Sequence, residues 1–155
     1  MRYKRVATGG TFDHIHKGHI KLLERSFEVG DEVVIGVTSD EFAAKEGKKP
    51  DFPYDQRVRQ LESLLQDRFP GRKYVIAKLY DYFGPGIASP DVEAIVVTRE
   101  TSSRVPIANK MREERGYPPL KVVGIDNVLA KDGNPISSTR IRNGEIDAEG
   151  NLLAP

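Results

Sequence analysis

Hydrophobic residues recur along the chain in two alternating patterns, short β-branched runs and longer segments with helical spacing. The run at 32–38 has the continuous apolar character of a strand that is buried on both faces. The segment 17–29 has helical spacing, because Ile20, Leu23 and Phe27 fall on one face. With the apolar run at 5–8 before them, these segments predict a βαβ unit, and hence a parallel sheet with a right-handed crossover.

The same alternation continues along the rest of the chain. Further strands are predicted at 73–79, 93–98 and 120–125, and further helices at 55–69 and 103–115. Serine and aspartate caps predict a short helix ending near Ala44 and a last helical turn that starts at Ser137 or Ser138 and ends near Asn143. The segments 46–53, 80–90 and 126–135 are predicted to be loops. We therefore predict a single doubly wound, Rossmann-like α/β domain with a five-stranded parallel sheet. Its core spans about residues 3–142, and a tail of little periodicity follows over 144–155.

Unusual residues gather where the predicted strands end. These segments are 9–19, 39–50, 80–86, 99–104 and 126–142. In doubly wound sheets, ligands bind beyond the carboxyl ends of the strands, near the point where the strand order reverses. The coincidence predicts one shared site.

Composition narrows the classes of function. The 155 residues suit one domain, and the net charge of +1 gives no reason to expect a nucleic acid or an anionic membrane as partner. The absence of cysteine excludes disulfides, thiol catalysis and thiolate metal sites. The N-terminus lacks the apolar segment of a signal peptide, and no apolar run reaches membrane-spanning length, so we expect a cytoplasmic protein.

All three histidines lie in one stretch, Thr8–His19, between the first strand and the first helix. Gly9 and Gly10 would let the backbone turn sharply, and the helix start offers unpaired N–H groups and a positive dipole end that suit phosphate. His16 and His19 are three residues apart and would share a face of the first turn. An anionic site is the favoured interpretation. A glycine turn with incidental histidines and a metal site are the alternatives, although the spacing differs from the i,i+4 pair of zinc sites.

Two motifs carry a resemblance to a known superfamily. Thr11-Phe12-Asp13 with His16-Lys17-Gly18-His19 resembles the GTFD…HxGH signature of the nucleotidyltransferases, which attach a nucleotide to an acceptor and release pyrophosphate. The stretch Ile136-Ser137-Ser138-Thr139-Arg140-Ile141-Arg142 resembles their second signature, a helix start rich in hydroxyl and guanidinium groups. A plain serine cap is the alternative for that stretch. The resemblance implies the nucleotidylyltransferase type of fold and ATP or phosphate binding by Gly10, Thr11, Phe12, Gly18, Ser137, Ser138, Thr139 and Arg142.

Three further stretches resemble phosphopantetheine adenylyltransferases. Lys48-Lys49-Pro50-Asp51-Phe52, followed by Arg57-Val58, is similar to their lysine loop, in which the first lysine reaches the reacting phosphates. Thr98-Arg99-Glu100-Thr101 is similar to the archaeal and eukaryotic branch and lacks the bacterial Arg-Gly-x-Arg; Arg104 could replace the missing arginine. Tyr80-Asp81-Tyr82-Phe83-Gly84-Pro85 is similar to that branch's Asp-x-x-Gly-Pro loop. A solvated lysine, a surface arginine and an ordinary packed loop are the respective alternatives.

This resemblance implies a reaction and the residues that carry it. The reaction is adenylyl transfer from ATP to 4′-phosphopantetheine, which gives dephospho-coenzyme A and pyrophosphate in coenzyme A biosynthesis, by direct in-line attack without a covalent intermediate. The implied catalytic residues are His16, His19, Lys48 and Arg99, and the implied acceptor-binding residues are Thr11, Lys48, Asp81, Tyr82 and Arg99. Mg²⁺ is expected to arrive with ATP rather than on a protein metal site, since the sequence shows no dedicated carboxylate cluster.

Two other functions stay open. One is another member of the superfamily, such as a glycerol-phosphate cytidylyltransferase or an FAD synthetase, although 131–135 departs from the arginine-led second motif of those enzymes. The other is a nucleotide-binding module without catalysis, against which the presence of both motif histidines argues. The expected partners are therefore small molecules, with no nucleic acid and no membrane. The oligomeric state is left open, with a monomer favoured.

Overall fold

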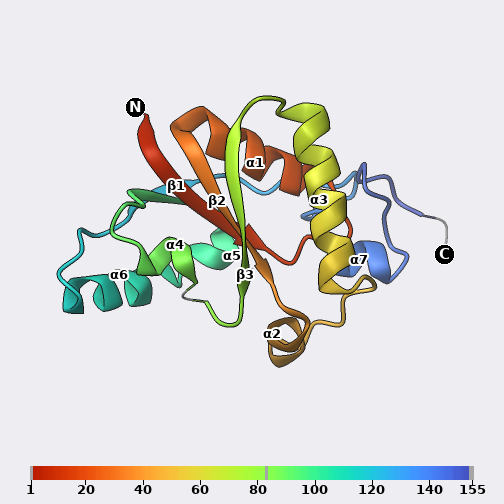
Figure 1. Ribbon diagram of the computed structural model, residues 1–155. Helices are drawn as coiled ribbons and strands as arrows, with labels where there is room; N and C mark the ends of the chain where they lie inside the picture. The colour runs from red at the N-terminus through yellow and green to blue at the C-terminus, as the bar shows by residue number, and fades with distance from the viewer. Residues whose placement is uncertain (1, 83, 154–155) are drawn as a thin grey trace.

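A five-stranded, wholly parallel sheet with the strand order β3-β2-β1-β4-β5 is the centre of the computed structural model, which describes residues 2–82 and 84–153 (Figure 1). The strands are β1 (Tyr3–Gly10), β2 (Gly30–Thr38), β3 (Lys73–Leu79), β4 (Ala94–Val97) and β5 (Lys121–Gly124). The helices are α1 (Lys17–Val29), α2 (Asp40–Lys45), α3 (Tyr54–Arg68), α4 (Pro85–Ala88), α5 (Arg99–Ser102), α6 (Val105–Glu114) and α7 (Ser138–Arg142). The doubly wound α/β prediction is confirmed, and the strand order reverses between β1 and β4.

The two faces of the sheet are packed differently. On one face, Val6 and Ile35 are fully buried beneath large side chains of α1 and α3, among them Phe27 and Leu61. On the other face, Ala7 and its neighbours meet α4 and α6 through smaller side chains, among them Ala108. Figure 1 shows α4 and α6 on one side of β1 and β2 and α3 on the other. The second face is therefore less completely filled than the first.

The first strand is longer than the sequence predicts. It includes Gly9 and Gly10, where we expected the sharp turn, and the left-handed residue is Phe12, with φ 54°. The glycines serve close approach instead, because a Cβ at Gly9 would lie 3.2 Å from the carbonyl oxygen of Gly36 on β2. The ring of Phe12 is fully buried, and this packing holds an unfavourable backbone conformation in place.

Two helical segments also differ from the prediction. The helix expected at 103–115 is present as α6, and a further short helix, α5, precedes it, with a break at Ser103 and Arg104. Thr98 and Thr101 form a capping box that starts α5 at Arg99, four residues before the helix that the periodicity indicates. The short helix α4 lies inside the expected loop 80–90, because four residues are too few to show a period.

The C-terminal segment is hydrogen-bonded as far as residue 153, although its sequence shows little periodicity. Ile146 is fully buried against Ala130 and Ile136, and an isolated antiparallel bridge joins Ile146 to Leu152. A single anchoring isoleucine gives no periodic signal, so sequence patterning could not find this contact. The last two residues of the expected tail lie outside the described residues.

Candidate active site

The histidine pair begins helix α1 and caps it. Nδ1 of His16 accepts a hydrogen bond from the Gly18 backbone N–H at 3.0 Å, and Nδ1 of His19 accepts one from the His16 backbone N–H at 3.2 Å. The two rings are stacked with centroids 3.9 Å apart, so the predicted shared face is confirmed. Because Nδ1 is an acceptor in both rings, each neutral ring carries its proton on Nε2. The pair therefore offers two N–H donors that the helix cap does not use.

Gly18 is required by this arrangement. A Cβ at this position would lie 2.7 Å from Cε1 and 2.9 Å from Nδ1 of the His16 ring, closer than side chains tolerate. The His16 ring folds over the Gly18 backbone to reach its N–H. The glycine between the two histidines thus permits the cap itself.

Both rings are neutral in the free protein at neutral pH. Burial, and then the nearby His14, lower the pKa of His16 to about 4. Burial also lowers the pKa of His19 well below its usual value, with smaller contributions from the neighbouring His16, which disfavours a second protonated ring, and from the charge of Lys48. Lys48 is thus among the groups that lower the pKa of His19, so the predicted lysine acts electrostatically on the predicted catalytic ring.

Asp13 joins three segments of the site. Its side chain is fully buried and accepts hydrogen bonds from the backbone N–H groups of Asp51 at 3.1 Å and Phe52 at 3.0 Å, and from Arg142 Nη1 at 2.9 Å. The first loop, the lysine loop and α7 therefore meet at one carboxylate. Sequence analysis included Asp13 in a motif but gave it no role.

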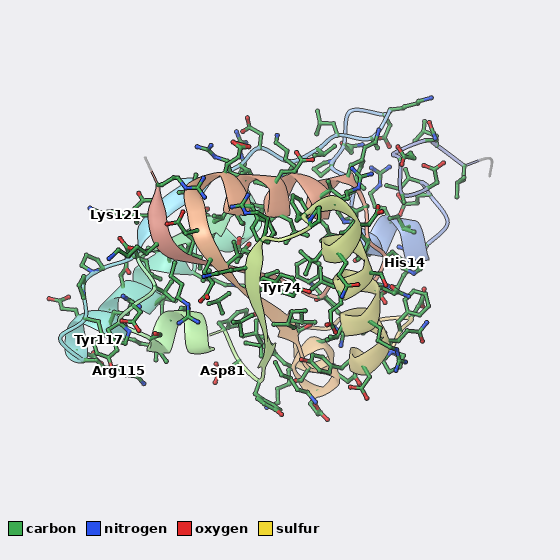
Figure 2. The ribbon with its side chains drawn as sticks, turned by 45° about the horizontal axis from the view of Figure 1, so that its top comes forward. His14, Tyr74, Asp81, Arg115, Tyr117 and Lys121 are labelled. Atoms are coloured by element: carbon green, nitrogen blue, oxygen red, sulfur yellow. The ribbon has the colours of Figure 1, made fainter. Side chains whose placement is uncertain are left out.

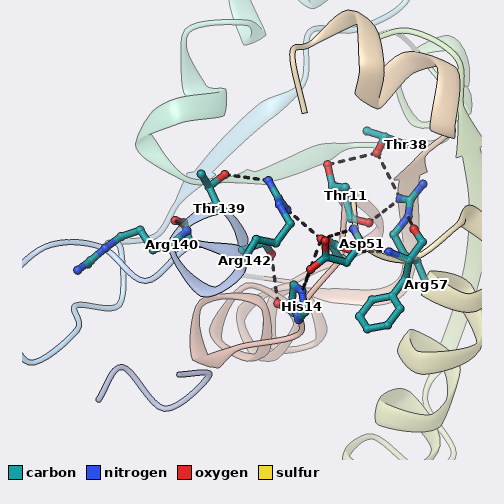
Figure 3. A network of polar contacts seen from close by, with 12 residues as sticks. Thr11, His14, Thr38, Asp51, Arg57, Thr139, Arg140 and Arg142 are labelled. Atoms are coloured by element: carbon teal, nitrogen blue, oxygen red, sulfur yellow. Dashed lines mark hydrogen bonds and ion pairs between the residues drawn. The ribbon is translucent and has the colours of Figure 1, made fainter. Parts of the chain in front are cut away.

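Arg57 is a second buried connector that sequence analysis missed as a site residue. Its side chain is fully buried and donates to the carbonyl oxygens of Thr11 at 2.7 Å and Phe52 at 3.0 Å, and to the carboxylate of Asp40 at 2.8 Å (Figure 3). A signal existed, since Arg57 lies four residues before the inward-facing Leu61 and shares its helical face. A charged residue on an apolar face indicates a buried polar contact.

Helix α7 is docked on the first loop. Ser137 Oγ caps the helix by accepting from the Arg140 backbone N–H at 3.2 Å, and Ser138 Oγ donates to the carbonyl oxygen of His14 at 3.2 Å. His14 accordingly lies beside α7 in Figure 2. Arg142 also donates to Thr139 Oγ1 at 3.1 Å. The cap that we considered as the alternative is thus present, and phosphate binding by this helix start stays a prediction.

A cavity of about 160 Å³ opens on the α4 and α6 face, at the carboxyl ends of β1 and β2. It is hollow because small residues line this face of the sheet: Ala7, Gly9, Gly36 and Ala77. Its polar lining comes from Thr8, Thr11, Thr38, Glu46, Lys48, Tyr82, Thr101 and Arg104.

The cavity brings some predicted acceptor residues together and leaves others aside. Thr11, Lys48 and Tyr82 all line it. Asp81 and Arg99 are exposed and are not among the lining residues, and Figure 2 shows Asp81 at the outer surface. Arg99 is the first residue of α5, where its carbonyl oxygen accepts from Ser102 Oγ at 2.9 Å. The roles of Asp81 and Arg99 stay predictions.

Asp13, His14 and Asp51 are close enough to share a metal ion, with ligand atoms within 4.8 Å of one another. However, His14 Nε2 already lies 2.7 Å from Asp51 Oδ2, and the Asp13 carboxylate is engaged by two amides and Arg142. A guanidinium in contact with the carboxylate opposes a second cation at the same place. The group does not fit a Mg²⁺ site, since Mg²⁺ also prefers oxygen ligands.

Comparison with known proteins places the chain in a class. Residues 7–144 match the cytidylyltransferase-like family, and the chain belongs to this family of nucleotidyltransferases. Within it, the chain is 47% identical over 152 residues to phosphopantetheine adenylyltransferase of Methanothermobacter thermautotrophicus, covering 98% of this chain and 91% of that protein. It is 42% identical over 146 residues to the protein of the same name from Methanopyrus kandleri, covering 94% and 92%. The expected resemblance to the archaeal branch is confirmed.

A solved structure supports the fold independently. The crystal structure of a protein with unknown function from Archaeoglobus fulgidus matches with a TM-score of 0.72 and 28% identity, covering 86% of this chain and 99% of that chain. Among the helices in the described ranges, none is long and apolar enough to cross a membrane.

Proposed function

We propose that this protein transfers the adenylyl group of ATP to 4′-phosphopantetheine, giving dephospho-coenzyme A and pyrophosphate. The His16–His19 donor pair, together with a Lys48 that lines an apolar cavity and acts electrostatically on His19, carries this proposal, since the combination offers phosphate donors and room for an uncharged arm. The names of the curated relatives support the choice of acceptor.

The chemistry needs no general base. The acceptor phosphate has a second pKa near ~6, so at neutral pH it is already a nucleophile. Direct in-line attack on the α-phosphate then requires positioning and stabilisation of developing negative charge. The Nε2–H groups of His16 and His19, together with Lys48, are donors suited to that task. Ser137 and Ser138 are engaged as a cap and as a docking contact, which supports a mechanism without a covalent intermediate.

The two substrates would occupy neighbouring parts of the site. ATP phosphates would bind between two segments. One runs from the end of β1 to the start of α1 and carries Gly10, Thr11, Phe12 and Gly18, and the other is α7 with its cap and carries Ser137, Ser138, Thr139 and Arg142. The acceptor phosphate would lie near Thr11 and Lys48, and the arm would enter the cavity past Tyr82. Asp81 and Arg99 would have to approach from the exposed rim, because neither lines the cavity.

Mg²⁺ would enter bound to the phosphates of ATP. The nearby groups are already engaged, since His14 contacts Asp51 and Asp13 accepts a hydrogen bond from Arg142. A cytoplasmic location and a monomeric state complete the proposal. Small-molecule substrates and a near-neutral net charge support the absence of nucleic-acid and membrane partners.

The test offers the purified protein ATP or CTP with phosphopantetheine, glycerol 3-phosphate or FMN and measures pyrophosphate. We expect rapid release only with ATP and phosphopantetheine. Preferred turnover of glycerol 3-phosphate or FMN would overturn the acceptor and leave the family intact. ATP binding without pyrophosphate release with any acceptor would indicate the non-catalytic module.

A further inference from the structure

Three side chains from separate segments meet in the lining of the apolar cavity. Glu46 follows α2, Tyr82 follows β3, and Arg104 lies in the break between α5 and α6. Tyr82 Oη donates a short hydrogen bond to Glu46 Oε2, and Arg104 Nη2 lies 3.7 Å from the same oxygen. The Arg104 guanidinium stacks over the Tyr82 ring, with Cζ 3.8 Å from the ring centroid. One carboxylate thus engages two donors that belong to other parts of the chain.

The carboxylate is the acceptor of this cluster, and the other two groups are its donors. The Glu46 side chain is 17% exposed, while that of Arg104 is 42% exposed. The Phe42 and Tyr82 rings pack in a T-shaped arrangement, with centroids 4.9 Å apart, which helps to orient the phenol. The hydrogen bond to Glu46 raises the pKa of Tyr82, as expected when a phenol O–H faces a carboxylate.

The Glu46 side chain can move away from Tyr82 and Arg104 without any movement of α2. The Glu46 N–H is bound to the carbonyl oxygens of Phe42 at 3.1 Å and Ala43 at 3.2 Å, so the main chain is held by the helix end. Gly47 follows with φ 75° and open space around its Cα. Rotation of the side chain alone would bring the carboxylate into water, where it is well solvated.

We propose that Glu46 occupies, in the free protein, the donors that recognise the acceptor arm, so that Tyr82 O–H and Arg104 N–H bind an amide carbonyl of the arm once Glu46 is displaced. This inference rests on the proposed function. A pantetheine arm carries two amide carbonyls and no charge, and amide carbonyls are the hydrogen-bond acceptors that these donors can bind in place of a carboxylate. When an amide carbonyl replaces the Glu46 carboxylate, the Tyr82 O–H and the Arg104 N–H have a hydrogen-bond acceptor both in the free and in the bound protein. An arm without carbonyl groups would leave these donors without an acceptor. Glu46, Tyr82 and Arg104 would therefore determine specificity for the acceptor.

Substitutions within this cluster should change the affinity for phosphopantetheine in opposite directions. Glu46→Gln keeps the shape but removes the charge that competes with the arm, so the Kd for phosphopantetheine should fall about three- to tenfold. Tyr82→Phe and Arg104→Gln each remove a donor, so the same Kd should rise about three- to tenfold. The Kd for ATP should stay the same in all three variants. A cluster that only supports the cavity wall would weaken acceptor binding in every variant.

Calorimetry with the full chain, with thermal melting as a check on folding, measures these constants. Matched controls are Glu41→Gln, Tyr80→Phe and Arg115→Gln, which make the same chemical changes at exposed positions. The experiment is repeated with pantetheine, which has the arm but no phosphate, and the same signs are expected. Weaker binding in Glu46→Gln, or effects that vanish with pantetheine, would overturn the inference and leave the proposed function standing. A wild-type protein that does not bind phosphopantetheine would overturn both.

Discussion

His16 and His19 each use one ring nitrogen for structure and keep the other for chemistry. Nδ1 of each ring accepts a backbone hydrogen bond of the α1 cap, and this fixes the tautomer that carries Nε2–H. Burial keeps both rings neutral, so each acts as a hydrogen-bond donor without adding a charge to the free protein. The helix start thereby positions the donors before any substrate arrives.

Replacing His19 by alanine should slow the chemical step. The loss of a donor to developing charge typically reduces the rate by ~10²–10³, and ATP binding should weaken less. Single-turnover rates and ATP dissociation constants measure the two effects, and melting curves exclude unfolding. Near-normal chemistry in a folded His19→Ala protein would contradict the role of this ring.

The buried His16 should also make stability depend on pH. Its pKa is lowered to about 4, whereas an unfolded histidine titrates near ~6.5, so the unfolded state binds the proton first. The stabilisation is complete above pH ~6.5 and is lost as the pH falls to ~4, by roughly 3 kcal/mol for this residue. Denaturant unfolding between these pH values measures the loss. His16→Asn keeps a good cap and should show a flatter profile; an equally steep profile would contradict this account.

At the scale of elements, the lysine loop is anchored at both ends. The Lys48 N–H binds the Ala43 carbonyl oxygen at 2.9 Å, and the buried Asp13 holds the N–H groups of Asp51 and Phe52. Sequence composition indicates a mobile loop over 46–53, because it shows the charges and the glycine but not the distant carboxylate. The anchored geometry limits freedom to the residues between the two ends.

Because the loop is anchored, we expect Lys48, and not Lys49, to reach the reacting phosphates. Lys48→Ala should lower turnover at least ~10²-fold, as expected for a group that stabilises transition-state charge, with little change in melting temperature. Lys49→Ala is the matched control, because it removes the same charge one residue away on an exposed position. Steady-state kinetics and melting curves compare the pair. Greater damage from Lys49→Ala would show that the other lysine reaches the phosphates.

Across the whole molecule, one face of the sheet is filled by large side chains and the other is left hollow. Phe27, Leu61 and Leu65 complete the first face, whereas Ala7 and Ala77 leave space on the second. The same sheet thus provides a rigid support on one side and a binding cavity on the other.

A larger side chain on the hollow face of the sheet should weaken binding of the acceptor but not of ATP. Ala77→Val adds two methyl groups inside the cavity, so the KM for the acceptor should rise about tenfold while the Kd for ATP stays the same. Val75→Ile is the control, since it adds one methyl group on the same strand at a side chain that is 43% exposed. An equal increase in both variants, or a matching loss of ATP binding, would argue against the cavity as the acceptor site.

Local patterns predicted the elements of this molecule, and distant polar contacts set their exact assembly. The helical spacing of Leu23 and Phe27 and the apolar run of β2 were sufficient for the βαβ unit. The Asp13–Arg142 pair spans 129 residues and leaves no periodic trace in the sequence. The motifs therefore indicated which residues gather, while the buried connectors Asp13 and Arg57 had to be found in the structure.

The two roles of the histidine pair, capping α1 and donating hydrogen bonds, affect how its presence in related proteins is interpreted. A descendant that abandoned the reaction would still need a capping residue at position 16, but asparagine would serve that purpose, so only the need for an Nε2–H donor keeps histidine there. Selection for folding alone would then preserve a cap at the start of α1 but not the histidine pair. Across related genomes, a retained cap without the two histidines would mark a protein that has kept the fold and lost the reaction, and Lys48, which caps nothing in α1, should be lost with them.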